Sequence, residues 1–195
     1  MTRISTSEKV ALAVALGLFT SIATAQPPPL PLPPAQVTNW TNWFSEEWPR
    51  HVGVCNIESA VSGINASGPY SDNLQLACKS FGAAPWHLDH ASSRWLSFFS
   101  EEPYNARWCM AGEVVTGVQA SGSFSDNLAL QCTPLKDSMD RLTRIEGCHW
   151  LGPVSDETGP RTALNAEWAL GARCTGSYCD NVDLYVCTVL PPSEY

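Results

Sequence analysis

The chain has 195 residues, of which 44 % are hydrophobic, so it is long enough for one globular domain with a sizeable core. Its formal net charge of −8 argues against a nucleic-acid partner, because an acidic surface repels phosphate backbones. After the N-terminal leader no stretch is apolar enough to predict insertion into a membrane.

The first residues, 1–25, have the pattern of a secretory signal peptide. Two basic residues, Arg3 and Lys9, precede an apolar run, and Ala23-Thr24-Ala25 offers a small-residue cleavage site. Residues 26–36 are rich in proline and predict a stiff, extended linker without a packed core. We therefore expect a secreted, extracellular protein whose folded domain spans residues 37–190.

One sequence motif recurs three times in the folded part: a glycine, any residue, an aromatic residue, Ser or Cys, Asp and Asn. Its glycines, Gly68, Gly122 and Gly176, are 54 residues apart. A fixed period of this length indicates one supersecondary unit used three times. The three repeats cover residues 38–80, 93–134 and 148–189.

Each repeat has the same predicted elements. A tryptophan lies near its start, and we expect these three rings, Trp40, Trp95 and Trp150, to be buried and to meet around a pseudo-threefold axis. A middle strand follows at 61–66, 115–120 and 169–174, where apolar residues alternate with polar ones. The repeated motif comes next, is rich in turn-forming residues and leads into a last strand with a Leu-x-Leu type of pattern. Helix-period patterns are absent from the folded part, which predicts an all-β protein.

The last strand of the third repeat differs by one residue. Leu76 and Cys78 share a predicted strand face in the first repeat, but Cys187 comes one residue later than the repeat requires. We therefore predict a β-bulge near Tyr185-Val186, since an extra residue in a strand forms a bulge.

The eight cysteines predict four disulfides, because an even number in an oxidising compartment is typical of a disulfide framework. Zinc is the alternative, but the closest pair has no matching pair elsewhere. The repeat spacing pairs the cysteines of the first two repeats, and the remaining cysteines are assigned to the third. The predicted bonds are Cys55–Cys78, Cys109–Cys132, Cys148–Cys187 and Cys174–Cys179.

Three such units predict a pseudo-threefold domain, a β-prism or alternatively a β-trefoil. The order of early aromatic residues, cysteine, glycine-ended strand, Asp-containing loop and Leu-x-Leu-x-Cys resembles the repeats of the vitelline membrane outer layer protein family, which are secreted, disulfide-bonded type I β-prisms. It resembles more loosely the dermatopontin family of extracellular matrix proteins. The chain departs from both, having Ser-Asp-Asn-Leu at 71–74 and lacking Asp-Arg-x-Trp.

The repeated loops supply the candidate ligand-binding residues. A sugar site needs an apolar face for the ring and planar donors and acceptors for the hydroxyls, which an aromatic residue near Asp-Asn offers. Three copies would add avidity for a multivalent glycan surface. The alternative is that Asp and Asn only cap the turns while the aromatic residue packs. The candidates are Tyr70, Asp72, Asn73, Phe124, Asp126, Asn127, Tyr178, Asp180 and Asn181.

We expect no cofactor and no metal, with calcium on the loop aspartates as a less favoured alternative. Acidic pairs such as Glu46-Glu47 could suggest a glycosidase, but neighbouring strand residues point to opposite faces, and no catalytic residue is assigned. The sequence thus favours a secreted, non-catalytic, lectin-like protein whose partners are extracellular glycans or matrix components. A structural matrix or coat protein is the first alternative and a secreted hydrolase the second.

Overall fold

The computed structural model describes residues 38–192 with gaps at 48–50, 83–85, 103–104 and 165. The predicted signal peptide and proline-rich linker lie outside the described residues. Within them the regular structure is β-strand and short 3₁₀ turns, and no helix there is long and apolar enough to cross a membrane. The strands are β1 (Thr38–Trp40), β2 (Val52–Val54), β3 (Ser59–Ser67), β4 (Asn73–Ser80), β5 (Trp86–Leu88), β6 (Arg94–Trp95), β7 (Ala106–Trp108), β8 (Glu113–Ser121), β9 (Asn127–Asp137), β10 (Arg144–Trp150), β11 (Arg161–Thr162), β12 (Glu167–Thr175) and β13 (Asn181–Leu190).

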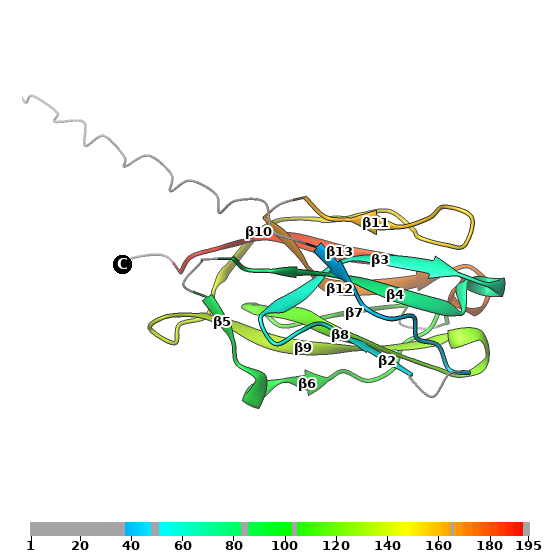
Figure 1. Ribbon diagram of the computed structural model, residues 1–195, viewed down its shortest axis with the longest axis horizontal. Coiled ribbons are helices and arrows are strands. Elements are labelled where there is room, and N and C mark those ends of the chain that lie inside the picture. The colour runs from blue at the N-terminus through cyan, green and yellow to red at the C-terminus, as the bar shows by residue number, and fades with distance from the viewer. Residues whose placement is uncertain (1–37, 48–50, 83–85, 103–104, 165, 193–195) are drawn as a thin grey trace, which may run out of the picture. The chain divides into compact units, whose positions relative to one another are not determined.

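The strands form three antiparallel sheets of equivalent construction (Figure 1). The first sheet has the order β1-β4-β3-β11 and the third the order β10-β13-β12-β7. The second has β2, β8 and β9, with β6 and β5 pairing different parts of β9. The expected all-β fold is confirmed, and three antiparallel sheets of this kind, two with four strands and one with five, are consistent with a type I β-prism.

Each sheet borrows one edge strand from another repeat. Strand β2 of the first repeat pairs with β8 of the second, and β7 of the second pairs with β12 of the third. Strand β11 of the third repeat pairs with β3 of the first and closes the ring. We call these three places the first, second and third joints, in that order. Because of this exchange, no repeat contains a complete sheet of its own.

A β-bulge lies in the middle strand of every repeat, and not in β13 as predicted. The register shifts between Val61 and Gly63 in β3, and at the equivalent places in β8 and β12. The glycine after each bulge allows the borrowed strand to approach, since a Cβ on Gly63 would lie 2.4 Å from the carbonyl oxygen of Arg161.

A register shift does lie opposite Tyr185-Val186, but the extra residue is Leu170 in β12, so strand β13 itself keeps its alternation and the prediction is corrected as to which strand is bulged. Val186 pairs with Ala169 as Cys78 pairs with Val61, so Val186 stands in the cysteine position of the repeat. Since neighbouring strand residues point to opposite faces, Cys187 faces away from the axial core. A further register shift lies in β10, between Glu146 and His149, opposite Cys187.

Four disulfides are present, and they are the four pairs expected from the spacing. Cys55 follows β2, which pairs in the second sheet, and bonds Cys78 on β4 of the first sheet, so this bond within the first repeat links the two sheets beside the first joint. Cys109–Cys132, within the second repeat, links the second and third sheets beside the second joint in the same way. The other two bonds lie within the third repeat. Four disulfides indicate an oxidising environment.

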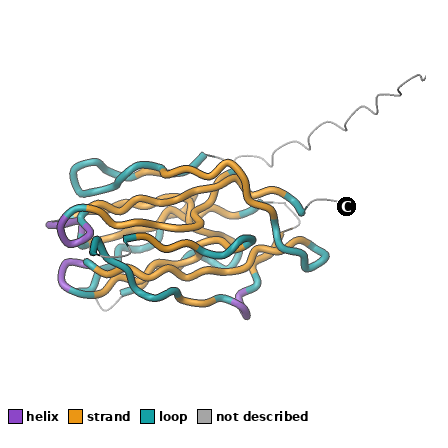
Figure 2. Tube along the Cα trace, turned by 180° about the vertical axis from the view of Figure 1, so that it is seen from behind, coloured by secondary structure: helices purple, strands orange, loops and turns teal. Residues whose placement is uncertain are grey.

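The axial core lies between the three sheets and contains equivalent residues from each repeat. It is made of layers contributed threefold: Phe44, Phe99 and Val154; Val61, Val115 and Ala169; Ile64, Val118 and Ala172; Leu74, Leu128 and Val182; Leu76, Leu130 and Leu184. A second cluster forms around Trp168, with Phe81 stacked on its ring. The turns after the three middle strands gather at one end of the sheets, opposite the end where β13 finishes (Figures 1 and 2).

Candidate functional site

The three repeated loops converge at that end of the domain. Each forms a 3₁₀ turn: η1 (Pro69–Ser71), η3 (Ser123–Ser125) and η4 (Ser177–Cys179). The ring centroids of Tyr70, Phe124 and Tyr178 lie 5.0, 5.4 and 5.5 Å from one another. We call these three rings the aromatic cluster. The structure therefore brings the predicted loops into one surface, where their three rings form a single cluster.

The rings of the aromatic cluster are held in an unusual backbone conformation. Tyr70, Phe124 and Tyr178 have φ values of 57°, 60° and 59°, in the left-handed region that bulky residues rarely adopt. Their side chains remain 47, 37 and 43 % exposed. A left-handed aromatic residue costs about 1–2 kcal/mol, and such conformations concentrate at functional positions.

The Asp-Asn pairs of the loops hydrogen-bond internally. Asn73 Nδ2 donates to Asp72 Oδ1 over 2.6 Å, and the pairs in the other two loops make the same bond. Each aspartate oxygen also fills the space beside the loop glycine, since a Cβ on Gly68 would lie 2.3 Å from Asp72 Oδ1. Gly68 has φ +85°, so both its conformation and its crowding require glycine. These contacts give the pairs a role in shaping the turns.

The acidic segments early in each repeat join each loop to its neighbour. Ser125 Oγ of the second repeat donates to Glu46 of the first, and the Tyr178 amide of the third donates to Glu101 of the second over 3.1 Å. The Asp156 amide of the third repeat donates to Ser71 Oγ of the first over 3.0 Å. This ring of contacts was not predicted from the sequence. The sequence feature that could have indicated it is that the three acidic pairs occupy equivalent positions in the three repeats.

Negative charge is concentrated beside the aromatic cluster. Burial raises the pKa of Asp72, and the nearby carboxylates of Glu46 and Glu47 raise it further. Burial also raises the pKa of Asp126, with Glu101 and Glu46 adding to the effect. This end thus presents aromatic rings surrounded by acceptor oxygens.

The repeated tryptophans do not meet around the axis, which corrects the expectation. Trp40 and Trp95 are 39 and 40 % exposed, and Trp150 is half-buried against Tyr185. All three occupy equivalent edge-strand positions; Trp40, for example, pairs with Ala77. Ala77 alternates with core residue Leu76, so its cross-strand partner faces outward. Among the described tryptophans, the one that is fully buried is the unrepeated Trp168.

The loop aspartates are not gathered into a metal site in the described ranges. The group of potential ligands within 4.8 Å of one another there is Cys109, Glu113 and Cys132. The two sulfurs of this group are bonded to each other, so they are not available as thiolate ligands. No metal-dependent step is derived from these residues.

Comparison with known proteins identifies no family: no protein-family model, no curated protein and no solved structure matches the chain.

Proposed function

We propose that this protein is secreted and binds extracellular glycans without catalysing a reaction, through the end of the domain that carries the aromatic cluster. The observation that carries the proposal is the convergence of Tyr70, Phe124 and Tyr178, exposed and in left-handed backbone, beside the loop carboxylates. Aromatic rings pack against the apolar faces of sugars, and carboxylates accept hydrogen bonds from their hydroxyls.

The resemblance to the vitelline membrane outer layer protein family belongs to this proposal. It is supported by the three equivalent antiparallel sheets and by the two disulfides that link neighbouring sheets. Membership would imply a secreted extracellular protein but would leave the ligand open.

A structural matrix or coat protein is the second candidate. It is favoured by the Asp-Asn pairs, whose Oδ1 and Nδ2 atoms bond each other and so serve the turn. In that case the aromatic cluster would be the packed end of the fold and would bind no saccharide.

A glycan array tests the proposal with three proteins. The first is the wild type, and the second carries Tyr70→Asn, Phe124→Asn and Tyr178→Asn, because asparagine tolerates left-handed backbone and the turns should persist. The third, Trp95→Ala, is the control for loss of an exposed aromatic ring elsewhere. We expect the wild type and Trp95→Ala to bind the same glycans and the triple variant to lose at least about tenfold in affinity, roughly 1.4 kcal/mol.

Two results would contradict the proposal. One is an array on which the wild type binds nothing, which favours the structural candidate. The other is a triple variant that binds like the wild type, which moves the site away from the aromatic cluster. A companion variant with Asp72→Ala, Asp126→Ala and Asp180→Ala reports whether the carboxylates take part.

A further inference from the structure

A row of aromatic residues crosses the outward face of the third sheet. Strand pairing places Trp150 of β10 beside Tyr185 of β13. Tyr185 in turn pairs with Gly171 of β12, and Gly171 pairs with Trp108 of β7. Gly171 alternates along β12 with the core residue Ala172, so the row points away from the axis.

The glycine in this row lets the rings on either side of it come together. A Cβ on Gly171 would lie 2.6 Å from Cδ1 of Trp108, so the indole occupies the space that a larger residue would need. The ring centroids of Trp108 and Trp150 lie 6.4 Å apart, and those of Trp150 and Tyr185 lie 5.0 Å apart. Because Trp108 is 52 % exposed, the three rings form one aromatic surface that is open on the side of Trp108.

A hollow of about 310 Å³ opens beside these rings, toward the end of the sheet where β13 finishes. Leu170, the extra residue of the bulge in β12, is part of its lining. Among the described residues that line the hollow, none carries a charge. With Leu170, its main lining residues are Trp108, Met110, Ile145, Tyr185 and the disulfide-bonded Cys148 and Cys187.

The second repeat has a hydrogen-bonded polar pair where this hollow has apolar residues. By strand register, Leu170 corresponds to Thr116, and Cys187 corresponds to Thr133. The hydroxyl oxygens of Thr116 and Thr133 lie 2.7 Å apart and share a hydrogen bond, and both residues are buried. Because the fold accommodates polar residues at this place, it does not require an apolar hollow there.

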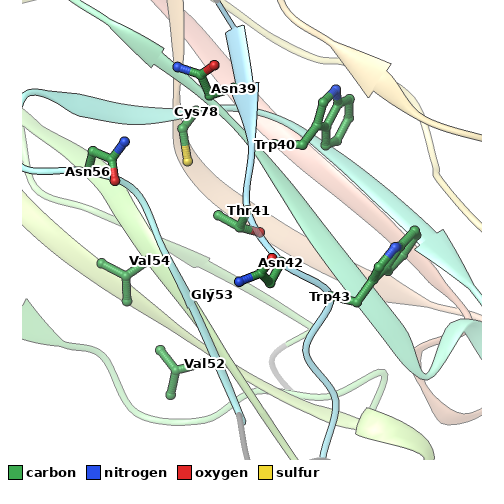
Figure 3. A pocket seen from close by; sticks show the side chains of 10 residues that line it. All are labelled: Asn39, Trp40, Thr41, Asn42, Trp43, Val52, Gly53, Val54, Asn56 and Cys78. Carbon is green, nitrogen blue, oxygen red and sulfur yellow. The ribbon is translucent and has the colours of Figure 1, made fainter.

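The first repeat also lacks the aromatic row. Trp40, the counterpart of Trp150, pairs with Ala77, which stands where the third sheet has Tyr185. The groove beside Trp40 is larger, about 480 Å³, but the Trp40 indole points away from β2, which carries its opposite wall (Figure 3). The combination of a row of rings with an apolar hollow is therefore specific to the third sheet.

The composition and size of the hollow indicate the class of its ligand. Apart from sulfur atoms, the described lining side chains offer the Trp108 N–H and the Tyr185 O–H as hydrogen-bonding groups, too few for the hydroxyls of a sugar. The Arg173 guanidinium, 4.2 Å from the Trp150 ring centroid, is paired with Asp183 over 2.8 Å, which disfavours an anion. Pockets for small organic molecules begin at about 300 Å³. Interplanar angles of 59° and 54° between the rings suit edge-to-face contact with a further aromatic ring.

We propose that the third sheet carries a binding site for a neutral aromatic small molecule, held in the hollow beside Trp108, Tyr185 and Leu170. The site lies on the outward face of one sheet, whereas the aromatic cluster lies at the end that carries the repeated loops. Its ligand class also differs from that of the proposed function. Each of the two sites can therefore fail without the other.

The test is an NMR titration of the full chain that follows the indole N–H signals of Trp108 and Trp150. The probes are naphthalene and toluene, with glucose as the polar comparison. The variant Trp108→Val introduces the residue that the second sheet has at the equivalent place, and Leu170→Thr introduces the residue of the second repeat. The matched control is Trp95→Ala, which removes an exposed indole from the second sheet.

We expect naphthalene or toluene to shift both indole signals in a saturable manner and glucose to leave them unchanged. The affinity, measured from the Trp150 signal, should fall about tenfold or more in Trp108→Val and in Leu170→Thr and should stay unchanged in Trp95→Ala. Because Trp108 is half-exposed, Trp108→Val should fold and provides the test even if Leu170→Thr does not fold. The triple aromatic-cluster variant should bind the probes like the wild type.

Absence of a shift with both aromatic probes overturns this proposal and leaves the proposed function standing. Equal losses of affinity in Trp108→Val and Trp95→Ala also overturn it, because binding then does not depend on the hollow. A shift with glucose alone overturns the ligand class.

Discussion

Lys79 is a buried lysine at the third joint. Its side chain is 3 % exposed, and Nζ donates to the carbonyl oxygen of Leu164 over 2.6 Å. The ammonium also lies 4.7 Å from the ring centroid of Trp168, whose Nε1 donates to the Lys79 carbonyl oxygen. Burial lowers the pKa of Lys79 to about 8, against the opposing effect of Glu167.

This shift predicts a pH dependence of stability. Between about pH 8 and the usual lysine pKa of 10.5 the unfolded state binds more protons than the folded state, so the free energy of unfolding should rise with pH in that window. Below about pH 8 lysine is charged in both states and the cost of burying its charge is fully present. Lys79→Met removes this dependence, and replacing a buried charge by an apolar group is often neutral or stabilising by about 1–4 kcal/mol.

Urea unfolding of both proteins at pH 7, 8.5 and 10 measures the effect. We expect the stability of Lys79→Met relative to the wild type to be greatest at pH 7 and to shrink as the pH rises. A difference that stays constant from pH 7 to pH 10 would show that the ammonium is not desolvated in the folded state.

The repeated side chains show what a period can and cannot predict. The amino-acid sequences of the loops predict three equivalent turns, because glycine, Asp and Asn have local conformational preferences. Where Tyr70, Phe124 and Tyr178 point depends on how the three sheets close, which no local pattern encodes. The same limit explains Trp40, whose outward direction follows from its pairing with Ala77 and not from its hydrophobicity.

The three joints have equivalent strand pairings, but only two of them have a disulfide beside them. Beside the first and second joints, disulfides tie the residue after β2 to β4 and the residue after β7 to β9, and both bonds have a Cα–Cα distance of 5.5 Å. At the third joint Ala163 and Val186 stand in the two cysteine positions. The Ala163 amide donates to the Ser62 carbonyl oxygen, as the Cys55 amide donates to that of Thr116. The backbone of the third joint thus matches the other two.

This equivalence predicts that Ala163→Cys with Val186→Cys forms a fifth disulfide. The new bond would close a loop of the same sequence separation as Cys55–Cys78, 23 residues, and should add about 3 kcal/mol of stability. Non-reducing peptide mapping identifies the bond, and thermal unfolding measures the gain.

The single variant Ala163→Ser is the control for a small polar change at that position. Free thiols at 163 and 186, or a bond from position 186 to Cys148 in place of Cys187, would contradict the equivalence of the joints.

The strand-level prediction that failed concerns the same repeat. The extra residue before Cys187 predicts a bulge in the last strand only if the cysteine keeps its face, and the register shift opposite Tyr185-Val186 comes from Leu170 in β12. Val186 keeps that face, and the cysteine bonds outward to Cys148 on β10. The bulges that do exist, such as the one between Val61 and Gly63, are common to all three repeats and so leave no difference in spacing.

At the scale of the whole domain, stability depends on closing a ring of exchanged strands. The all-β class and the threefold organisation could be predicted, since both follow from a short alternating pattern repeated at a fixed period. The exchange could not, because β2, β7 and β11 are only two or three residues long and carry little pattern of their own.

The exchange predicts that two repeats are insufficient. A chain ending at residue 134 would keep the β2–β8 pairing but would leave β7 without β12 and β3 without β11. Unpaired strand edges promote association between chains. We expect this chain to form oligomers or to remain unfolded, as measured by size-exclusion chromatography with light scattering.

The control is the protein that contains residues 37–195 with all three repeats, and it should be monomeric if the ring closes within one molecule. A two-repeat chain that is a folded monomer with dispersed amide signals would show that the exchanged strands are dispensable.

The absence of a disulfide beside the third joint has a mechanical consequence. Disulfides tie the residue after β2 to β4 and the residue after β7 to β9, whereas no such bond ties the end of β11 to β13, so β11 is the exchanged strand that can move furthest once its hydrogen bonds to β3 break. Partial opening, protease entry and exchange of a strand with another molecule would all begin there. Because Lys79 lies at the third joint, a rise in pH through the pKa of Lys79 should make this joint harder to open.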